Sequence, residues 1–332
     1  MWFEALTGFP EESPRQVREN IAVDGHTLTS SINGRTLFCG ELETPSLAEL
    51  RKRVQASGHK TGETSVREVV ANVQHLHSNE SNAGALFQVA SQFNLLEMVS
   101  PRITPEQGVG IYEHDLTQGP ACAIAAGAGT IYRNYFAPVN GKMGQSQAHQ
   151  IDCLADIGQA LGNFDNRLWV MQNGYALASH SGLEEISNRL RAASELERDE
   201  LRQLLRLGIQ WKTQVTLRDC NHRVSQVYCS ALPVAYSGQP SHLWAEFAQL
   251  VLDASYEATL CAAILNSVEN GNNTLFLTLL GGGAFGNDTD WIIESIRRAL
   301  TLYKHAGLDV AIVSYGSSKP SVQKLVNQPY TS

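Results

Sequence analysis

The stretch that most constrains the fold of this chain runs from Thr274 to Leu300. It begins with an apolar, uncharged segment of strand length and continues into a loop of four glycines, 281–286. From Thr289, apolar residues recur at helical spacing and predict a helix. Strand, glycine loop and helix in this order can hold a phosphate group, because bare backbone N–H groups point at the anion.

Strands and helices alternate most clearly in the last third of the chain, which predicts an α/β fold with a mixed central sheet and helices on both faces. Asn-Gly pairs at 33–34 and 173–174 predict two hairpins as additions. We expect residues 1–80 to form an N-terminal hairpin and helices packed on a main domain, 81–332, with an insertion at about 165–240. The predicted strands are 85–90, 214–217, 223–231, 274–280 and 308–314, and the predicted helices are 47–54, 65–77, 121–132, 150–161, 183–207, 241–270, one from 289 and one from 320.

Composition excludes several classes of protein. A net charge of −8 argues against a nucleic-acid groove, and the chain has no run of 18 uncharged apolar residues that would span a membrane. The first residues lack the pattern of a secretory signal, and six cysteines show no CxxC or zinc spacing. We therefore expect a cytoplasmic protein with free thiols, no metal site, and neither nucleic acid nor membrane as partner.

Gly281, Gly283 and Gly286 also satisfy G-x-G-x-x-G, the dinucleotide fingerprint. A nicotinamide fold is disfavoured, because only one clear strand follows and its acid, Asp309, lies at the start of that strand rather than at its end. The P-loop signature, the serine elbow G-x-S-x-G and the H-E-x-x-H zinc motif are absent.

Polar residues also follow the predicted strand at 85–90, beginning with Ser91-Gln92-Phe93-Asn94. In open α/β sheets, ligands bind at the carboxyl ends of the strands. The segment 111–120 is predicted to be a loop with several polar side chains, and Pro120 suits the first turn of the helix after it.

The run Gly283-Ala284-Phe285-Gly286-Asn287-Asp288 resembles the glycine loop of the macrodomain fold, in particular that of poly(ADP-ribose) glycohydrolases. The resemblance implies a macrodomain-like domain in which this loop binds the diphosphate of ADP-ribose and Phe285 packs on the adjoining ribose. It also implies that Asn94 binds the distal ribose and that a second loop lies near Gly119. The ligand-binding residues expected from it are Gln92, Phe93, Asn94, Gly119, Gly281, Gly282, Gly283, Ala284, Phe285, Gly286, Asn287 and Tyr315.

The double-glutamate signature of the glycohydrolases is absent, so the resemblance favours removal of a single ADP-ribose over cutting of the polymer. The whole sequence is similar to divergent ADP-ribosyl-arginine hydrolases, which implies an ADP-ribosylated protein as substrate. No cofactor is expected, and Mg²⁺ is an alternative that the sequence does not indicate.

Hydrolysis at the ribose anomeric carbon passes through an oxocarbenium-like state and needs a carboxylate to activate water. Asp115 is the first candidate, Asp288 the second, and Glu113, Asp290 and Glu97 are further ones. Each has a structural alternative, since Asp115 and Asp288 can cap helices and Glu97 can be a surface acid on a helix. Tyr112 and Phe93 can flank the ligand or belong to the core.

Two other functions fit the same residues. The fold can recognise ADP-ribose without cleaving it. Alternatively, Cys122 at a helix start can act as the nucleophile of a thiol hydrolase with His114 as base, although a buried structural cysteine is favoured.

Overall fold

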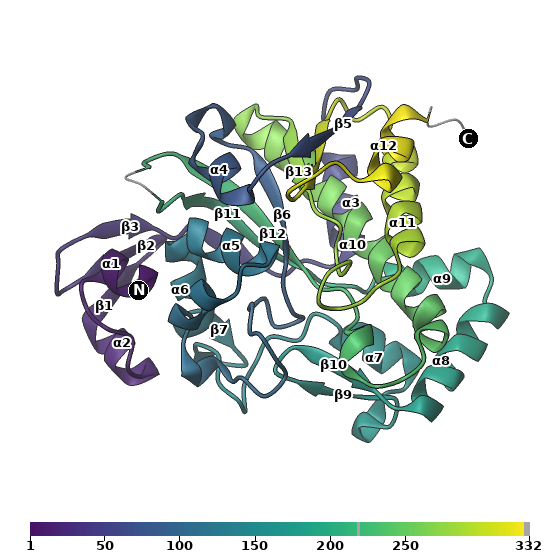
Figure 1. Cartoon of the computed structure of the whole chain (residues 1–332), viewed down its shortest axis with the longest axis horizontal. Helices are drawn as coiled ribbons and strands as arrows, with labels where there is room; N and C mark the ends of the chain where they lie inside the picture. The colour runs from purple at the N-terminus through teal and green to yellow at the C-terminus, as the bar shows by residue number, and fades with distance from the viewer. Residues whose placement is uncertain (218–219, 329–332) are drawn as a thin grey trace.

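The computed structural model describes residues 1–217 and 220–328, and a mixed seven-stranded sheet forms its centre (Figure 1). In sheet order the strands are β4 (Glu41–Glu43), β11 (Gly208–Gln214), β12 (Arg223–Cys229), β6 (Leu86–Ala90), β13 (Thr274–Leu277), β14 (Asp309–Ser314) and β5 (Ser65–Val70). The smaller sheets comprise β1 (Ile21–Asp24), β2 (Thr27–Ser30) and β3 (Thr36–Phe38); β7 (Pro138–Val139) and β8 (Lys142–Met143); and β9 (Trp169–Gln172) and β10 (Tyr175–Ala178).

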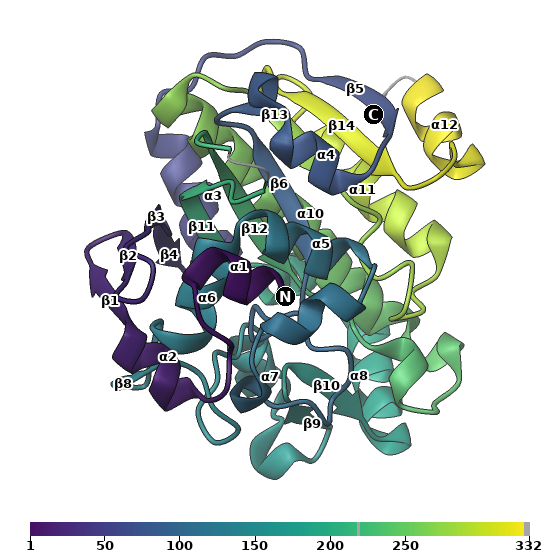
Figure 2. The same cartoon turned by 60° about the vertical axis from the view of Figure 1, so that its left-hand side comes forward.

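The helices surround this sheet, with the N-terminal elements on one side and α8 and α9 on another (Figures 1 and 2). They are α1 (Trp2–Thr7), α2 (Pro14–Asn20), α3 (Leu47–Ala56), α4 (Val73–Ser78), α5 (Gln118–Ala125), α6 (Gly127–Tyr135), α7 (Ala155–Leu161), α8 (His180–Ala192), α9 (Glu195–Arg202), α10 (Ser241–Asn270), α11 (Thr289–Leu302) and α12 (Pro320–Asn327).

The two faces of the sheet are covered by different helices, as neighbouring residues of β6 show. Gln88 donates to Thr259 Oγ1 of α10 at 3.1 Å. Phe87 points to the opposite face and stacks on His77 of α4, with ring centroids 3.8 Å apart. Because successive side chains of a strand alternate between faces, β6 is buried on both sides. The predicted α/β fold with a mixed central sheet and helices on both faces is confirmed.

Helix α10 is the only described helix that is long and apolar enough to cross a membrane. In this structure 89% of its most apolar 18-residue window is buried. It packs against α3, α8 and α11 and against strands β6, β12 and β13, so it is the central helix of one layer.

The structure corrects several predicted elements. Residues 65–77 are not one helix but strand β5 followed by the short helix α4, because β-branched Val66, Val69 and Val70 pair along β14. Strands β4 and β5 lie in the central sheet, although residues 1–80 were expected to form an addition to it. The predicted helix at 121–132 is broken at Ala126, between α5 and α6.

The two Asn-Gly pairs behave differently. Asn173 and Gly174 connect β9 to β10, and both have positive φ angles, 47° and 80°, as a type I′ turn requires. Asn33-Gly34 lies instead in the longer connection between β2 and β3, and the two-residue turn of this sheet is Gly25-His26.

Strands β6 and β13 separate toward their carboxyl ends. They pair only at Leu275 with Leu86 and at Phe276 with Phe87. Beyond that point the side chain of Gln118 accepts from Ala90 N and donates to Gln88 O, both at 2.8 Å, in place of a neighbouring strand. Helix α5 therefore begins directly at the end of β6, and the sheet opens there.

Gly119 allows this close approach, and it generates a stability prediction. A Cβ atom added at Gly119 would lie 1.9 Å from Ala90 O, whereas one added at Gly283 would meet no atom within 4 Å. We expect Gly119→Ala to reduce the free energy of unfolding by about 1–3 kcal/mol, because the backbone must shift. Gly283→Ala, the matched control, should change it by less than about 0.5 kcal/mol. Chemical denaturation of both variants tests this; equal stabilities would contradict the packing described here.

Candidate functional site

A cavity with two lobes lies where β6 and β13 separate. The first lobe has a volume of about 420 Å³ and the second about 560 Å³. Both are lined by Leu116, Thr117, Gln118, Thr278, Leu279 and Gly283, so the start of α5 and the glycine loop lie between them. The cavity is at the carboxyl edge of the parallel strands, where an α/β sheet binds its ligands.

The glycine loop is fixed from behind and open toward the cavity. Asn287 N donates to Gly281 O at 2.9 Å, and Asn287 Nδ2 donates to Leu232 O at 2.8 Å. The backbone N–H groups of Gly283, Ala284 and Phe285 have no hydrogen-bond partner among the described residues. Three consecutive unpaired N–H groups beside a cavity can bind an anion.

Tyr256 fixes the start of this loop. Its hydroxyl donates to Thr278 O and accepts from Leu280 N, both at 2.8 Å. Gln88 Oε1 accepts from Thr278 N at 3.2 Å. Side chains of α10 and β6 thus satisfy backbone groups that a longer β13 would have paired in the sheet.

Three aromatic rings line one side of the first lobe. Phe285 comes from the glycine loop, Tyr175 from the β9–β10 hairpin and Tyr236 from the short helix η5 (Val234–Tyr236). Their centroids are 5.1–5.6 Å apart. Such a cluster offers an apolar surface to a ring of a ligand.

Glu97 is the buried carboxylate of the first lobe. It is 2% exposed, and its Oε2 has no hydrogen-bond partner. Oε1 is 3.5 Å from Arg133 Nη2, and Glu97 N donates to the hydroxyl of Tyr112 at 3.0 Å. Burial raises the pKa of Glu97 to about 7 against the opposing charge of Arg133. A carboxyl group that titrates near neutral pH can exchange a proton in the working range of an enzyme.

Asp115 lines the same lobe but is half-exposed. Its Oδ1 accepts from Thr117 N at 2.9 Å, which fixes the loop leading into α5. His114 is also at this lobe, and its side chain is 74% exposed. Asp115 is therefore not the cap of α5, since the N-cap is Thr117 and no side chain caps the helix, while its expected contact with a ligand stays a prediction.

The second lobe lies toward β14 and β5. Tyr315, expected to bind ligand, lines it and is 72% exposed, and Gly282 and Lys319 line it too. Glu68 of β5 fixes this loop by accepting from Ser314 Oγ and Ser318 Oγ, both at 2.6 Å. Burial acts to raise the pKa of Glu68, but these hydrogen bonds outweigh it and lower that pKa to about 2.

Several expected site residues lie elsewhere. Asn94 is fully buried and donates to Gln150 Oε1, while Phe93 belongs to the core. Asp288 accepts from Asp290 N as the N-cap of α11, which is its structural alternative. These residues, with Asn287, Gly286 and Asp290, do not line either lobe. The remaining expected ligand contacts, Gln92, Gly119, Gly281, Gly283, Ala284 and Phe285, line the first lobe.

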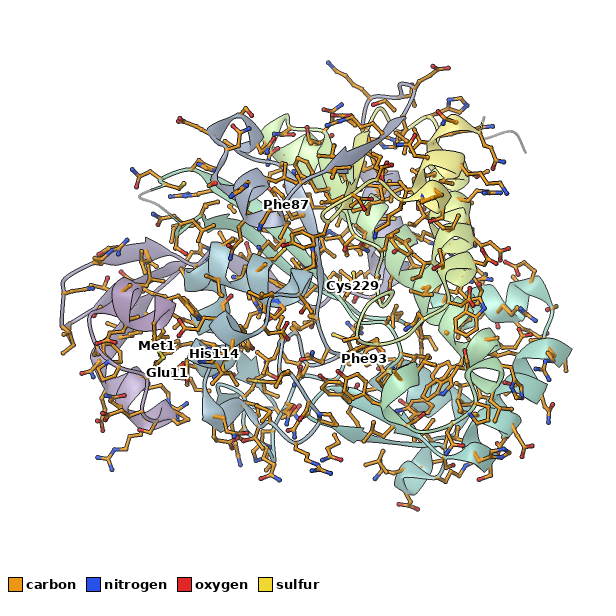
Figure 3. The ribbon with its side chains drawn as sticks, viewed as in Figure 1. Met1, Glu11, Phe87, Phe93, His114 and Cys229 are labelled. Atoms are coloured by element: carbon orange, nitrogen blue, oxygen red, sulfur yellow. The ribbon has the colours of Figure 1, made fainter. Side chains whose placement is uncertain are left out.

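Glu113 also lies outside the lining of both lobes, because it holds the N-terminal segment. Its Oε2 accepts from Trp2 N at 3.0 Å, and Glu11 Oε1 accepts from Val109 N at 3.0 Å. Figure 3 shows Met1, Glu11 and His114 in the same region of the molecule. The N-terminal segment thus braces the loop that carries His114 and Asp115.

Cys122 is not placed as a nucleophile. It is fully buried, it does not line the first lobe, and burial raises the pKa of its thiol well above the usual value. Within the described residues there is no group of three or more His, Cys, Asp or Glu side chains that could hold a metal ion.

Sequence reasoning underrated Glu97 and missed two aromatic residues of the cavity. Glu97 was expected on a helix surface, but 91–98 is an irregular buried segment whose polar groups bond each other, as Gln92 Oε1 does with Met98 N at 2.8 Å. The available signal was an acid within the apolar run Leu95-Leu96-Glu97-Met98. Tyr175 and Tyr236 reach the lobe from the insertion, which carries no such signal.

No protein-family model matches the sequence, and no curated protein matches it. Among solved structures, the chain is similar to poly(ADP-ribose) glycohydrolase from Deinococcus radiodurans in complex with ADP-ribose, at 12% identity and a TM-score of 0.44 over 86% of this chain and 90% of that one. It is also similar to poly(ADP-ribose) glycohydrolase from Thermomonospora curvata, at 12% identity and a TM-score of 0.45 over 94% of this chain and 95% of that one.

The raised pKa of Glu97 predicts how stability varies with pH. The folded state binds the Glu97 proton more tightly than the unfolded state, so this group's contribution is full below its ordinary pKa of 4.5 and is lost as pH rises through about 7. Between pH 5 and pH 8, we expect the free energy of unfolding of wild type to fall by on the order of 2–3 kcal/mol relative to that of Glu97→Gln. Denaturant unfolding at both pH values measures this difference. A stability difference between the two proteins that does not change with pH would contradict the environment assigned to Glu97.

Proposed function

We propose that this protein is a hydrolase that releases mono-ADP-ribose from modified proteins, with arginine as the modified side chain. The observation that carries this proposal is the row of unpaired N–H groups at Gly283, Ala284 and Phe285 between two lobes of one cavity. A diphosphate bound there has room for a group on each side, as in ADP-ribose. An alternative with the same fold is a module that binds ADP-ribose without cleaving it.

The two lobes suit different ends of the ligand. In the second lobe, the exposed ring of Tyr315 is available to stack on adenine. The first lobe holds the carboxyl groups of Glu97 and Asp115 together with the ring of Phe285, so we assign the reacting ribose to it. The proposed ligand therefore extends across the glycine loop, with the anomeric carbon facing the acids.

Charge favours a cationic leaving group. The first lobe is lined by Glu97, Asp115 and His114, and none of its described lining residues is a lysine or arginine. A guanidinium joined to ribose brings a positive charge into this lobe, where the carboxylate of Asp115 can stabilise it. This argument, added to the absence of a double-glutamate signature, supports a single ADP-ribose on arginine over a polymer of ADP-ribose.

The proposed reaction transfers one proton and uses no metal ion or cofactor. Water oxygen forms a bond to the anomeric carbon while the carbon–nitrogen bond breaks and its electron pair passes to the guanidine nitrogen. A carboxylate takes a proton from the water, and the released guanidine gains a proton, which restores the carboxylate. We assign this role to Glu97 or Asp115, the carboxyl groups that line the first lobe. We also propose an ADP-ribosylated cytoplasmic protein as the substrate.

Gly283 gives a direct test of ligand binding. A side chain at this position would enter open space rather than clash, so Gly283→Glu should fold. We expect it to lose at least about tenfold in affinity for ADP-ribose, because its carboxylate would fill and repel the diphosphate site. Isothermal titration calorimetry measures this, with Gln159→Glu on the exposed surface of α7 as the control for added charge. Wild-type protein that gives no heat with ADP-ribose would reject the site.

The two carboxylates are separated by their own variants. We expect Glu97→Gln and Asp115→Asn to bind ADP-ribose nearly as well as wild type, because the side chains bond to Arg133 and to Thr117 N rather than to the glycine loop. Loss of a proton-transferring group should slow release of ADP-ribose from an arginine-modified protein by about 10²-fold or more. Single-turnover release by each variant ranks the two residues. Binding by wild type without any release would favour the recognition module.

A further inference from the structure

Arg133 is the group that faces Glu97 from α6, yet it is held mainly by other residues. Its side chain is completely buried. Nε donates to Leu95 O at 3.0 Å, Nη1 donates to the hydroxyl of Tyr228, and Nη2 is 3.3 Å from Thr130 Oγ1. By contrast, Nη2 is 3.5 Å from Glu97 Oε1, at the outer limit of a hydrogen bond. The ion pair is therefore the longest of the four contacts.

Tyr228 holds the arginine in two ways. The guanidinium carbon of Arg133 lies 3.7 Å from the centre of the Tyr228 ring, within the range of a cation–π contact. The Tyr228 hydroxyl accepts from Arg133 and in turn donates to Gln226 Oε1. Tyr228 and Gln226 are two residues apart on β12, so both point to the same face of the sheet.

The chain of hydrogen bonds continues to α4 and has one direction. Gln226 Nε2 donates to Cys122 O at 2.9 Å and lies 3.0 Å from His77 Nε2. His77 Nδ1 lies 2.8 Å from Val73 O, a carbonyl that can only accept, so Nδ1 carries the proton and Nε2 accepts. Burial lowers the pKa of His77 to about 4, which keeps it neutral in this role. Each member thus fixes the donor or acceptor role of the next.

We propose that Tyr228 is a positioning residue, whose hydroxyl holds Arg133 away from Glu97 so that one carboxylate oxygen of Glu97 stays unpaired and the carboxyl group can exchange a proton. This inference rests on the proposed function for its catalytic consequence. The structure supplies its basis, since Arg133 reaches only Oε1 at 3.5 Å and Oε2 has no partner.

The charged and titratable groups around Glu97 determine how a change at Tyr228 would affect its ionisation. Arg133 faces it from α6, Tyr112 from η3 (Gly110–His114) and Cys122 from α5, while Asp115 and His114 share its lobe. Of these, Arg133 is the buried cation. If Tyr228 no longer holds Nη1, the guanidinium can move toward Glu97 and pair with both oxygens, which favours the ionised carboxylate.

The test is Tyr228→Phe, which keeps the ring and removes the hydroxyl. We expect kcat for release of ADP-ribose to fall about tenfold, with KM nearly unchanged, because the glycine loop is untouched. The rise of kcat with pH should also move to lower pH by about one unit or more, since Glu97 ionises more readily. Tyr303→Phe is the matched control: it removes a hydroxyl bonded to Cys261 Sγ at 3.0 Å, and Tyr303 lines neither lobe.

A purely structural role for Tyr228 gives a different result. Tyr228→Phe would then melt at a lower temperature, as Tyr303→Phe should, while kcat and the midpoint of its pH profile stay at the wild-type values. That outcome would overturn the proposal. If Tyr228 acts through Glu97, then Tyr228→Phe should not shift the midpoint of the kcat–pH profile in a protein that also carries Glu97→Gln.

A measurement that needs no substrate keeps the inference separate from the proposed function. The infrared band of the protonated Glu97 carboxyl, identified by its loss in Glu97→Gln, can be titrated in wild type and in Tyr228→Phe. We expect a midpoint near neutral pH in wild type and a lower one in the variant. A wild-type midpoint in the ordinary range of glutamate pKa values would overturn the inference. This titration does not need Tyr228→Phe, so it tests the inference even if that variant fails to fold. Wild type that shows the expected midpoint but releases no ADP-ribose would refute only the proposed function.

Discussion

The cavity depends on how the backbone is satisfied where β6 and β13 part. An unpaired strand end buried in a protein costs free energy, so a sheet does not open by itself. Here Gln118 replaces the missing strand on β6, and Gln88 and Tyr256 hold the end of β13. The same contacts place the start of α5 and the glycine loop on either side of the opening. The side chains that prevent sheet closure are therefore also those that position the loops.

The ion pair of Glu97 and Arg133, unlike those backbone groups, is incompletely satisfied. A buried ion pair repays its desolvation only when its geometry is good, and this pair is long and leaves one oxygen unpaired. Stability alone would favour a closer pair or apolar residues of the same volume. The surrounding polar groups, from Tyr112 to Tyr228 and Gln226, keep the arrangement in place. An arrangement that costs stability and opens onto a cavity is typical of a functional site.

Local sequence patterns predicted the elements that are determined by residues close together in the chain. The apolar run before the glycine loop, the helix at 241–270 and the Asn173-Gly174 turn are all present, because each is determined by periodicity or by a turn requirement. The segment 65–70 was misread as helical because its valines also fit a helical spacing, and only pairing with distant β14 decides for a strand. In the cavity, the glycine loop was foreseen, but the burial of Glu97, the positions of Tyr175 and Tyr236 and the inward turn of Asn94 arise from contacts between segments far apart. Sequence spacing carries no information on such contacts.

The pairing of β5 with β14 has a consequence for how the protein is made. Ser65 and Asp309 are partners across 244 positions, so β5 leaves the ribosome long before the strand that covers it. During that interval both edges of β5 are unpaired, since β14 is its only partner among the described strands, and contacts of such high sequence separation form slowly. The short, alternating Ser-Val-Arg-Glu-Val-Val sequence carries two charged residues, which is how natural proteins limit association through an open strand edge. Arg67 and Glu68 later bond to groups at the two ends of β14. The charged residues that limit association of the unpaired strand therefore also hold it to β14 in the folded protein.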